Sequence, residues 1–172
     1  MVYGRTTIWY SRGCPKCVGY EDFYYDPGVT PDRAYKPPHV FENLLRNVYQ
    51  TPTTCNAFMR RSVVVAVGAF EESFKGMFED QVFFAKVLLN SPVYVSSSVW
   101  AKYRQHPESA SAASKTAGAA RLRFLRWVAQ YLAKRNDVGS RTRLTLWSIL
   151  AKTWWDFAKT RISRRFRQAA AA

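Results

Sequence analysis

Hydrophobic and polar residues follow strand-like and helix-like patterns in turn along the first part of this chain. Met1–Tyr10 is rich in Val, Tyr, Thr, Ile and Trp, a composition that predicts a β-strand. The apolar residues of His39–Tyr49 recur at helical spacing and predict a short helix. Phe78–Leu89 is an apolar stretch that begins around the acidic pair Glu79-Asp80, and it predicts a second helix.

The segments between and after these elements give weaker signals. Thr53–Arg60 is expected to be a strand, and Ser62–Val67 a short apolar turn of helix or strand. Pro92–Ser97 and Val99–Arg104 are expected to be two short strands around a serine cluster. Ser11–Pro38 contains five prolines and three glycines, which predicts a long irregular loop. Loops of this length inside a compact domain are usually functional or mobile.

The composition changes near residue 115, where we place a boundary. An apolar stripe after Ala117 predicts one helix, formed by Leu122, Leu125, Val128, Ala129 and Leu132. After a turn at 136–140, a second amphipathic helix carries Leu144, Trp147, Leu150, Trp154 and Phe157. We therefore expect residues 1–115 to form an α/β domain and residues 116–172 a basic tail of two amphipathic helices.

The net charge of +14 is concentrated in this tail. Residues 119–172 contain 13 Lys and Arg against only Asp137 and Asp156, whereas residues 1–118 contain 13 against 10 acidic residues. This suggests a polyanionic partner, either an anionic membrane surface or nucleic acid. The tail's tryptophans favour the membrane, and no recognised nucleic-acid motif accompanies them. A plainer interpretation is that two helices pack on the first domain with their arginines in water.

The three cysteines, Cys14, Cys17 and Cys55, are an odd number without the pattern of a disulfide framework, which fits a reducing compartment. The C-x-x-C pair of Cys14 and Cys17 is half of a zinc site, and Cys55 with His39 would complete it at a spacing that matches no standard module. A redox role requires a thioredoxin-like βαβ unit, which the sequence lacks. The role of Cys14 and Cys17 therefore stays open.

The sequence also bears on location. No charged segment leading into an apolar core follows Met1, so no signal peptide is expected. The longest apolar runs are far below the roughly 18–20 residues that a membrane span requires. We expect a cytoplasmic protein that lies at the inner face of the cell membrane.

Three segments in the first domain carry side chains suited to chemistry: Gly68–Phe74 after an apolar turn, Phe78–Gln81 opening an apolar helix, and Trp100–His106 ending a strand. An acidic pair at a helix start usually only offsets the helix dipole, by about 1 kcal/mol at most. Taken together, in this order and spacing, the segments resemble the family 2 glycosyltransferases. The opening Val2-Tyr3-Gly4 strand resembles the segment after that family's metal-binding acidic motif. The resemblance covers roughly residues 1–110.

This resemblance implies the acceptor-side half of a GT-A fold, and transfer of a sugar from a nucleotide-sugar donor to an acceptor hydroxyl with inversion. An in-line displacement of this kind needs a base for the acceptor proton, and cationic groups or a metal for the departing diphosphate. Asp80 is implied as the base, and Glu79 as the group that orients it or contacts the acceptor. At a helix N-terminus, Asp80 is expected to stay ionised at neutral pH.

The resemblance also implies roles for flanking residues. Arg104 and His106 lie where the family has a late loop near the diphosphate, so Arg104 would bind phosphate and His106 phosphate or a metal ion. Phe78, Gln81 and Trp100 are implied on the acceptor side. The implied partners are a nucleotide sugar and a glycan, lipid-linked or other hydroxyl acceptor, in bacterial envelope or polysaccharide biosynthesis.

The chain also departs from the family. Family members carry an N-terminal nucleotide-binding βαβ region and an Asp-x-Asp motif that holds a divalent metal, Mg or Mn, and neither occurs here. We therefore expect a fragment whose donor site is incomplete by itself. The alternative is a non-catalytic basic module that binds an anionic membrane surface or nucleic acid.

Overall fold

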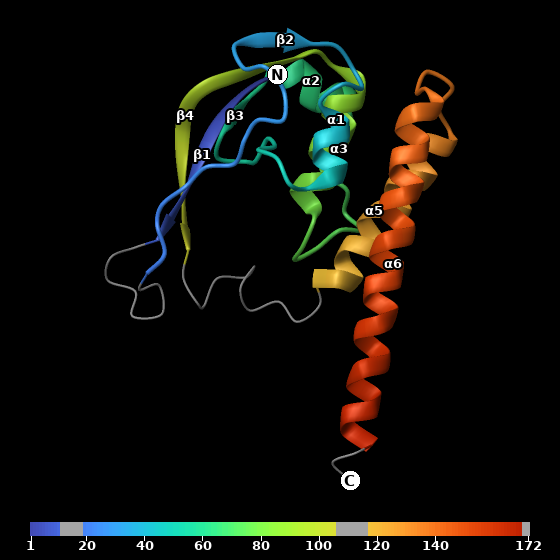
Figure 1. Ribbon diagram of the computed structural model, residues 1–172. Helices are drawn as coiled ribbons and strands as arrows, with labels where there is room; N and C mark the ends of the chain where they lie inside the picture. The colour runs from blue at the N-terminus through green and yellow to red at the C-terminus, as the bar shows by residue number, and fades with distance from the viewer. Residues whose placement is uncertain (11–18, 106–116, 170–172) are drawn as a thin grey trace. The chain divides into compact units, whose positions relative to one another are not determined.

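The computed structural model describes residues 1–10, 19–105 and 117–169, in two compact units, Met1–Lys115 and Thr116–Ala172 (Figure 1). The first unit is α/β and the second is helical. The elements of the first unit are β1 (Val2–Tyr10), β2 (Arg33–Tyr35), α1 (Phe41–Arg46), β3 (Ala57–Phe58), α2 (Arg61–Ala66), α3 (Glu79–Asn90) and β4 (Val93–Gln105). Those of the second are α5 (Ala117–Ala133) and α6 (Ser140–Ala169).

A four-stranded mixed sheet in the order β2-β4-β1-β3 forms the frame of the first unit. The long strands β1 and β4 run parallel at its centre, while the short strands β2 and β3 pair antiparallel at its edges. Parallel neighbours require a long crossover connection, and here that connection contains α1, α2 and α3. The β1–β4 pairing shifts register on either side of Arg5, so the central pair is bulged at this point.

The core of this unit lies where α1 and α3, which pack against each other, cover one face of the sheet (Figure 1). Every residue of α3 from Val82 to Leu89 is buried, so this helix is apolar nearly all round, as expected of a helix inside a core. The largest fully buried side chains of the unit are Tyr3, Phe41, Phe84, Leu44, Leu45 and Leu88.

Two buried amide side chains extend the pairing of β1 where β3 ends. Asn56 Nδ2 donates to the Gly4 carbonyl oxygen at 2.8 Å, and the Gly4 N–H donates to the Asn56 carbonyl oxygen at 3.0 Å. Further along, the Thr6 N–H donates to Gln50 Oε1 at 3.0 Å. Buried backbone groups must find partners, so these amides replace a longer edge strand. Beyond them, Ile8 forms an isolated antiparallel bridge with Phe23, and the Tyr10 N–H donates to Asp22 Oδ1 at 2.8 Å.

Gly4 allows a close approach that any side chain would block. A Cβ at this position would lie 2.5 Å from Trp100 Cγ and 2.7 Å from the Ser98 carbonyl oxygen. We expect Gly4→Ala to lower the free energy of unfolding by about 2 kcal/mol, a typical cost of overpacking. Gly139→Ala is the control, because nothing lies within 4 Å of its Cβ. Chemical denaturation of both variants checks this, and equal midpoints would contradict the packing argument.

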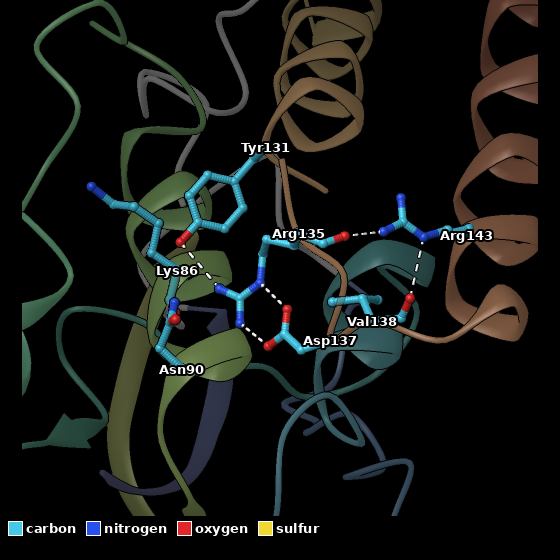
Figure 2. Close-up of polar contacts among 7 residues, drawn as sticks. All are labelled: Lys86, Asn90, Tyr131, Arg135, Asp137, Val138 and Arg143. Carbon is cyan, nitrogen blue, oxygen red and sulfur yellow. Dashed lines mark hydrogen bonds and ion pairs between the residues drawn. The ribbon is translucent and has the colours of Figure 1, made fainter. Parts of the chain in front are cut away.

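The second unit is a pair of packed helices whose connecting turn is closed by polar contacts (Figure 2). Arg135 Nε donates to Asp137 Oδ1 at 2.9 Å, and its guanidinium also donates to the Tyr131 hydroxyl at 3.5 Å. Arg143, in the first turn of α6, donates to the Val138 carbonyl oxygen at 3.2 Å and to the Arg135 carbonyl oxygen. These contacts satisfy carbonyl groups of the turn between α5 and α6.

The predicted helices of both units and the first strand are confirmed, while three other expectations need correction. Pro92–Ser97 and Val99–Arg104 form one continuous strand, β4, because it pairs along the whole length of β1. Only Ala57–Phe58 of the expected strand Thr53–Arg60 is a strand, since the Asn56 side chain accepts the Thr53 N–H at 2.6 Å and closes a turn.

The third correction concerns the proline-rich stretch expected to be irregular, which contains the short edge strand β2. The segment expected as either helix or strand is the helix α2. In the described part of the chain, none of the helices combines the length and the apolar character needed to cross a membrane.

Candidate functional site

A cavity of about 610 Å³ opens in the first unit beside the start of α3. This volume lies within the range of about 300–1,000 Å³ that is usual for small-molecule sites. The cavity is bounded by β1, by loop segments before and after α1, by the beginning of α3 and by the end of β4. Its lining residues are Thr6, Ile8, Tyr10, Phe23, Tyr25, Asn47, Tyr49, Gln50, Thr51, Thr53, Thr54, Cys55, Met77, Phe78, Asp80, Gln81, Tyr103 and Gln105.

The alternation of strand residues decides which part of the sheet faces the cavity. Thr6, Ile8 and Tyr10 are spaced two residues apart on β1, and all three line the cavity. On β4 the lining residues are Tyr103 and Gln105, which are the registered partners of Ile8 and Tyr10. The two central strands therefore present one continuous wall.

Aromatic rings share the lining of this cavity with amide and hydroxyl side chains. Six aromatic residues contribute: Tyr10, Phe23, Tyr25, Tyr49, Phe78 and Tyr103. The rings of Phe23 and Tyr25 meet edge to face with centroids 5.2 Å apart, which fixes their orientation. A cavity with both aromatic and hydrogen-bonding side chains suits a ligand that has both apolar and polar surfaces.

The backbone before α3 is strained at Phe78. This residue has φ 68° and ψ 9°, the left-handed region, which a bulky side chain rarely adopts. Its carbonyl oxygen accepts the Val82 N–H at 3.0 Å and so begins the helix. Strained backbone of this kind costs about 1–3 kcal/mol and is concentrated at functional sites. The strained residue Phe78 lines the cavity together with Asp80 and Gln81.

Among the described residues, Asp80 is the one acidic residue that lines the cavity. Its Oδ1 accepts the Gln81 N–H at 2.7 Å within the first turn of α3. Burial raises the pKa of the Asp80 carboxyl above its ordinary value, and the charge of Glu79 adds to this effect. The backbone N–H groups of the helix start lower the pKa, but burial is the larger effect. A buried carboxylate with a raised pKa is a stronger base than an exposed one.

Glu79 lies beside this carboxylate but does not line the cavity. Its Oε2 atom is buried, and it has no hydrogen-bond partner among the described residues. A buried carboxylate oxygen without a partner is costly and calls for an explanation. The negative charge of Glu79 raises the pKa of Asp80, since it disfavours a second charge nearby.

Of the residues implied by the sequence resemblance, the cavity brings together Phe78, Asp80 and Gln81. Trp100 instead lies over Gly4, with its ring 5.9 Å from that of Phe58, and it is not a lining residue. Arg104 is exposed on β4 between the lining residues Tyr103 and Gln105, so strand alternation turns it away from them. His106, Cys14 and Cys17 fall outside the described residues.

Most of the remaining lining residues were not predicted. The two-residue spacing of Thr6, Ile8 and Tyr10 was a signal available in the sequence, since such residues share one face of a strand. Tyr49 and Tyr25 carried no comparable signal, because loop contacts far apart in the chain bring them to the cavity.

The described residues do not supply a metal site. Among residues 1–10, 19–105 and 117–169, no three His, Cys, Asp or Glu side chains are grouped so that they could hold a metal ion. Cys55 is an exposed free thiol at the cavity, and His39 stacks on the Tyr35 ring with centroids 4.8 Å apart. A divalent metal of the kind implied by the resemblance therefore has no ligand set in this part of the chain.

Comparisons with protein-family models, with curated proteins and with solved structures found no match to this chain. The α/β class and the cavity around Asp80 rest on the chain's own geometry. The chemistry of the lining residues is therefore the basis on which a function can be proposed.

Proposed function

We propose that the first unit is the acceptor side of an inverting glycosyltransferase of GT-A type, and that the cavity binds the acceptor. The observation that carries this proposal is the position of Asp80: a half-buried carboxylate with a raised pKa lines a cavity of aromatic, amide and hydroxyl side chains at the start of a helix. The parallel strands β1 and β4, with α1 and α3 on one face, are compatible with part of an α/β transferase sheet.

In the proposed reaction, Asp80 accepts the proton of the acceptor hydroxyl. The hydroxyl oxygen then attacks the anomeric carbon of the donor sugar, and the bond from that carbon to the nucleoside diphosphate breaks. Attack opposite to the departing group inverts the anomeric centre. Asp80 must be ionised to act, and its raised pKa brings its basicity closer to that of an effective general base.

The lining of the cavity suits a sugar acceptor. A pyranose ring has apolar C–H faces that pack on aromatic rings, and hydroxyls that need hydrogen-bond partners. The six aromatic residues supply such rings, and Gln81, Gln105 and Asn47 supply amide groups. A purely apolar ligand would leave these amides unsatisfied, at a cost of about 1–3 kcal/mol for each buried group.

The nucleotide-sugar donor must be bound by groups other than those that line this cavity. The departing diphosphate requires cationic stabilisation. Strand alternation turns Arg104 away from the wall that contains Tyr103 and Gln105, so a phosphate contact by Arg104 would lie outside this cavity. A divalent metal would require ligands beyond the described residues. We therefore propose that the donor site is completed by a longer chain or by a second protein.

Translation of the DNA upstream of the Met1 codon tests this proposal first. An in-frame βαβ region with an acidic metal motif would supply the donor half, and the extended protein can then be assayed with a panel of nucleotide sugars. An in-frame stop close to Met1, together with no sugar transfer when cell extract is added to the chain, would contradict the proposal.

Acceptor binding provides a second test that needs no donor. Tyr103→Ala is expected to weaken binding of an acceptor glycan to the 172-residue chain about tenfold, because it removes one aromatic wall of the cavity. Tyr94→Ala is the control, since Tyr94 is a half-exposed tyrosine of the same strand that does not line the cavity. Saturation-transfer NMR with a glycan panel gives the readout. Equal losses in the two variants would contradict acceptor binding in this cavity.

A further inference from the structure

Helix α6 has two faces with apolar residues, and they differ in exposure. On one face, Thr142 and Leu146 are buried, and Ile149 and Thr153 are half-buried. These residues follow each other at spacings of three and four, as expected of a face packed on another element. Helix α5 packs against α6 within the same unit, so a buried face is expected.

The other face is exposed. Leu144, Trp147, Ala151 and Trp154 also follow each other at spacings of three and four, and Trp155 lies beside them. The exposed fractions are 69% for Leu144, 57% for Trp147, 52% for Trp154 and 55% for Trp155. Single exposed apolar residues are ordinary, but a continuous row with three tryptophans marks an interaction surface. We call these five residues the tryptophan face.

Basic residues border the tryptophan face. Arg141, Lys152 and Lys159 are exposed along one side of it, and the Lys159 amine lies 5.1 Å from the centre of the Trp155 ring. The sequence of α6 contains eight basic residues and a single acidic one, Asp156, which falls outside this face by helical position. The face is therefore apolar along its centre and positive at its border.

Helix α5 has no comparable surface. Its exposed positions include Arg123, Arg126, Gln130 and Ala133, and none of its exposed residues among those described is aromatic. Exposed tryptophans are thus a particular feature of α6 rather than a general property of this helical unit.

We propose that the tryptophan face of α6 binds an anionic phospholipid surface, with the helix lying in the plane of the interface. Tryptophan favours the level of the lipid headgroups, and lysine and arginine at the border are attracted to anionic lipids. This inference does not depend on the transferase proposed above, because it rests on the second unit alone.

Charge and pattern argue against other occupants. A second copy of the chain would carry the same net charge of +14, so joining two such helices would bring their basic borders together. A nucleic-acid surface would place basic residues along the centre of the face to meet phosphates. Here the centre is Leu144, Ala151 and the tryptophans, and the charges lie beside it.

Co-sedimentation of the full 172-residue chain with vesicles tests the proposal. Binding to vesicles of three parts phosphatidylcholine and one part phosphatidylglycerol is expected to be at least about tenfold tighter than to phosphatidylcholine alone. Raising the salt from about 0.1 M to about 1 M shortens the screening length from about 10 to 3 Å and should remove most of this preference.

Variants locate the interaction on α6. The double variant Trp147→Ala and Trp154→Ala is expected to weaken binding to the anionic vesicles about tenfold, because it removes two rings of the face. Trp9→Ala is the matched control: it removes a partly exposed tryptophan from β1 and should leave vesicle binding unchanged. Far-UV circular dichroism establishes that the helices persist in each variant.

Four outcomes would overturn the proposal. The first is equal binding of the parent chain to neutral and anionic vesicles, and the second is undiminished vesicle binding by the double variant. The third is a dimer in light scattering that the double variant converts to a monomer, which would make a second copy of the chain the occupant. Tighter binding to an oligonucleotide than to anionic vesicles, abolished by the same variant, would assign the face to nucleic acid and overturn the proposal as well.

Discussion

Asp80→Asn is expected to lower the rate of sugar transfer by about a thousandfold in the protein that contains a donor site, because it removes the proposed general base. The substitution keeps the size and shape of the side chain, and asparagine can still accept the Gln81 N–H. The measurement is incorporation of labelled sugar into the acceptor glycan. Glu72→Gln is the control, since this exposed carboxylate lies a few residues away and does not line the cavity.

The melting temperature of Asp80→Asn shows whether this variant folds, because the burial of Asp80 predicts the direction of the change. Its pKa is higher in the folded protein than the ordinary value of 3.8, so the folded state favours the protonated form. The stability that this group contributes is therefore fully present below pH 3.8 and is lost as the pH rises through the folded pKa. A neutral asparagine avoids this loss, so Asp80→Asn should raise the melting temperature at neutral pH. An unfolded or much less stable variant would contradict the assignment of a buried charge here.

The pH dependence of the transfer rate tests whether Asp80, rather than Glu79, is the group that accepts the proton. The rate should rise with pH as Asp80 ionises, since only the carboxylate can accept the proton. Glu79 raises the pKa of Asp80 through its charge, so Glu79→Gln should shift this rise to lower pH. A pH profile that Glu79→Gln does not change would argue that Asp80 is not the group that titrates.

Glu71→Ala is expected to lower the free energy of unfolding by about 3 kcal/mol, because it leaves a buried ammonium group without its partner. Lys86 lies in the middle of α3 with only 4% of its side chain exposed, and its Nζ is 2.9 Å from Glu71 Oε1. The same amine is 3.5 Å from the Gly68 carbonyl oxygen. This pair joins the segment before Phe78 to the buried helix. Asn90 Nδ2 donates to the Lys86 carbonyl oxygen at 2.6 Å one turn further along (Figure 2).

Substitution of the other partner, Lys86, should lower the free energy of unfolding much less. Lys86→Met keeps the apolar stem and removes the buried charge, while Glu71, with 36% of its side chain exposed, can be hydrated. We expect a loss of about 1 kcal/mol or less, because apolar replacements of buried charges are often nearly neutral. Chemical denaturation of both single variants and of the double variant gives the coupling between them. Equal losses from the two single variants would contradict this account.

The sequence by itself determined most of the local elements. Residue composition indicated β1, and the spacing of apolar residues indicated α1, α3 and the tail helices, because both signals depend only on residues close together in the sequence. The composition and charge placed a boundary near residue 115, and the two compact units divide between Lys115 and Thr116. The sequence also indicated Phe78, Asp80 and Gln81, which lie together at one helix start.

Only the tertiary structure decided how β4 is built and what surrounds Asp80. The serine cluster interrupts the apolar pattern of β4, but parallel pairing with β1 keeps it a single strand. The side chains of Asn56 and Gln50 form hydrogen bonds with the backbone of β1 beyond β3, and no sequence periodicity predicts these contacts. Tyr49 and Tyr103 reach the same cavity from a loop and a strand far apart in the sequence. Such contacts depend on the packing of whole elements, since burial of distant surfaces, and not local propensity, stabilises them.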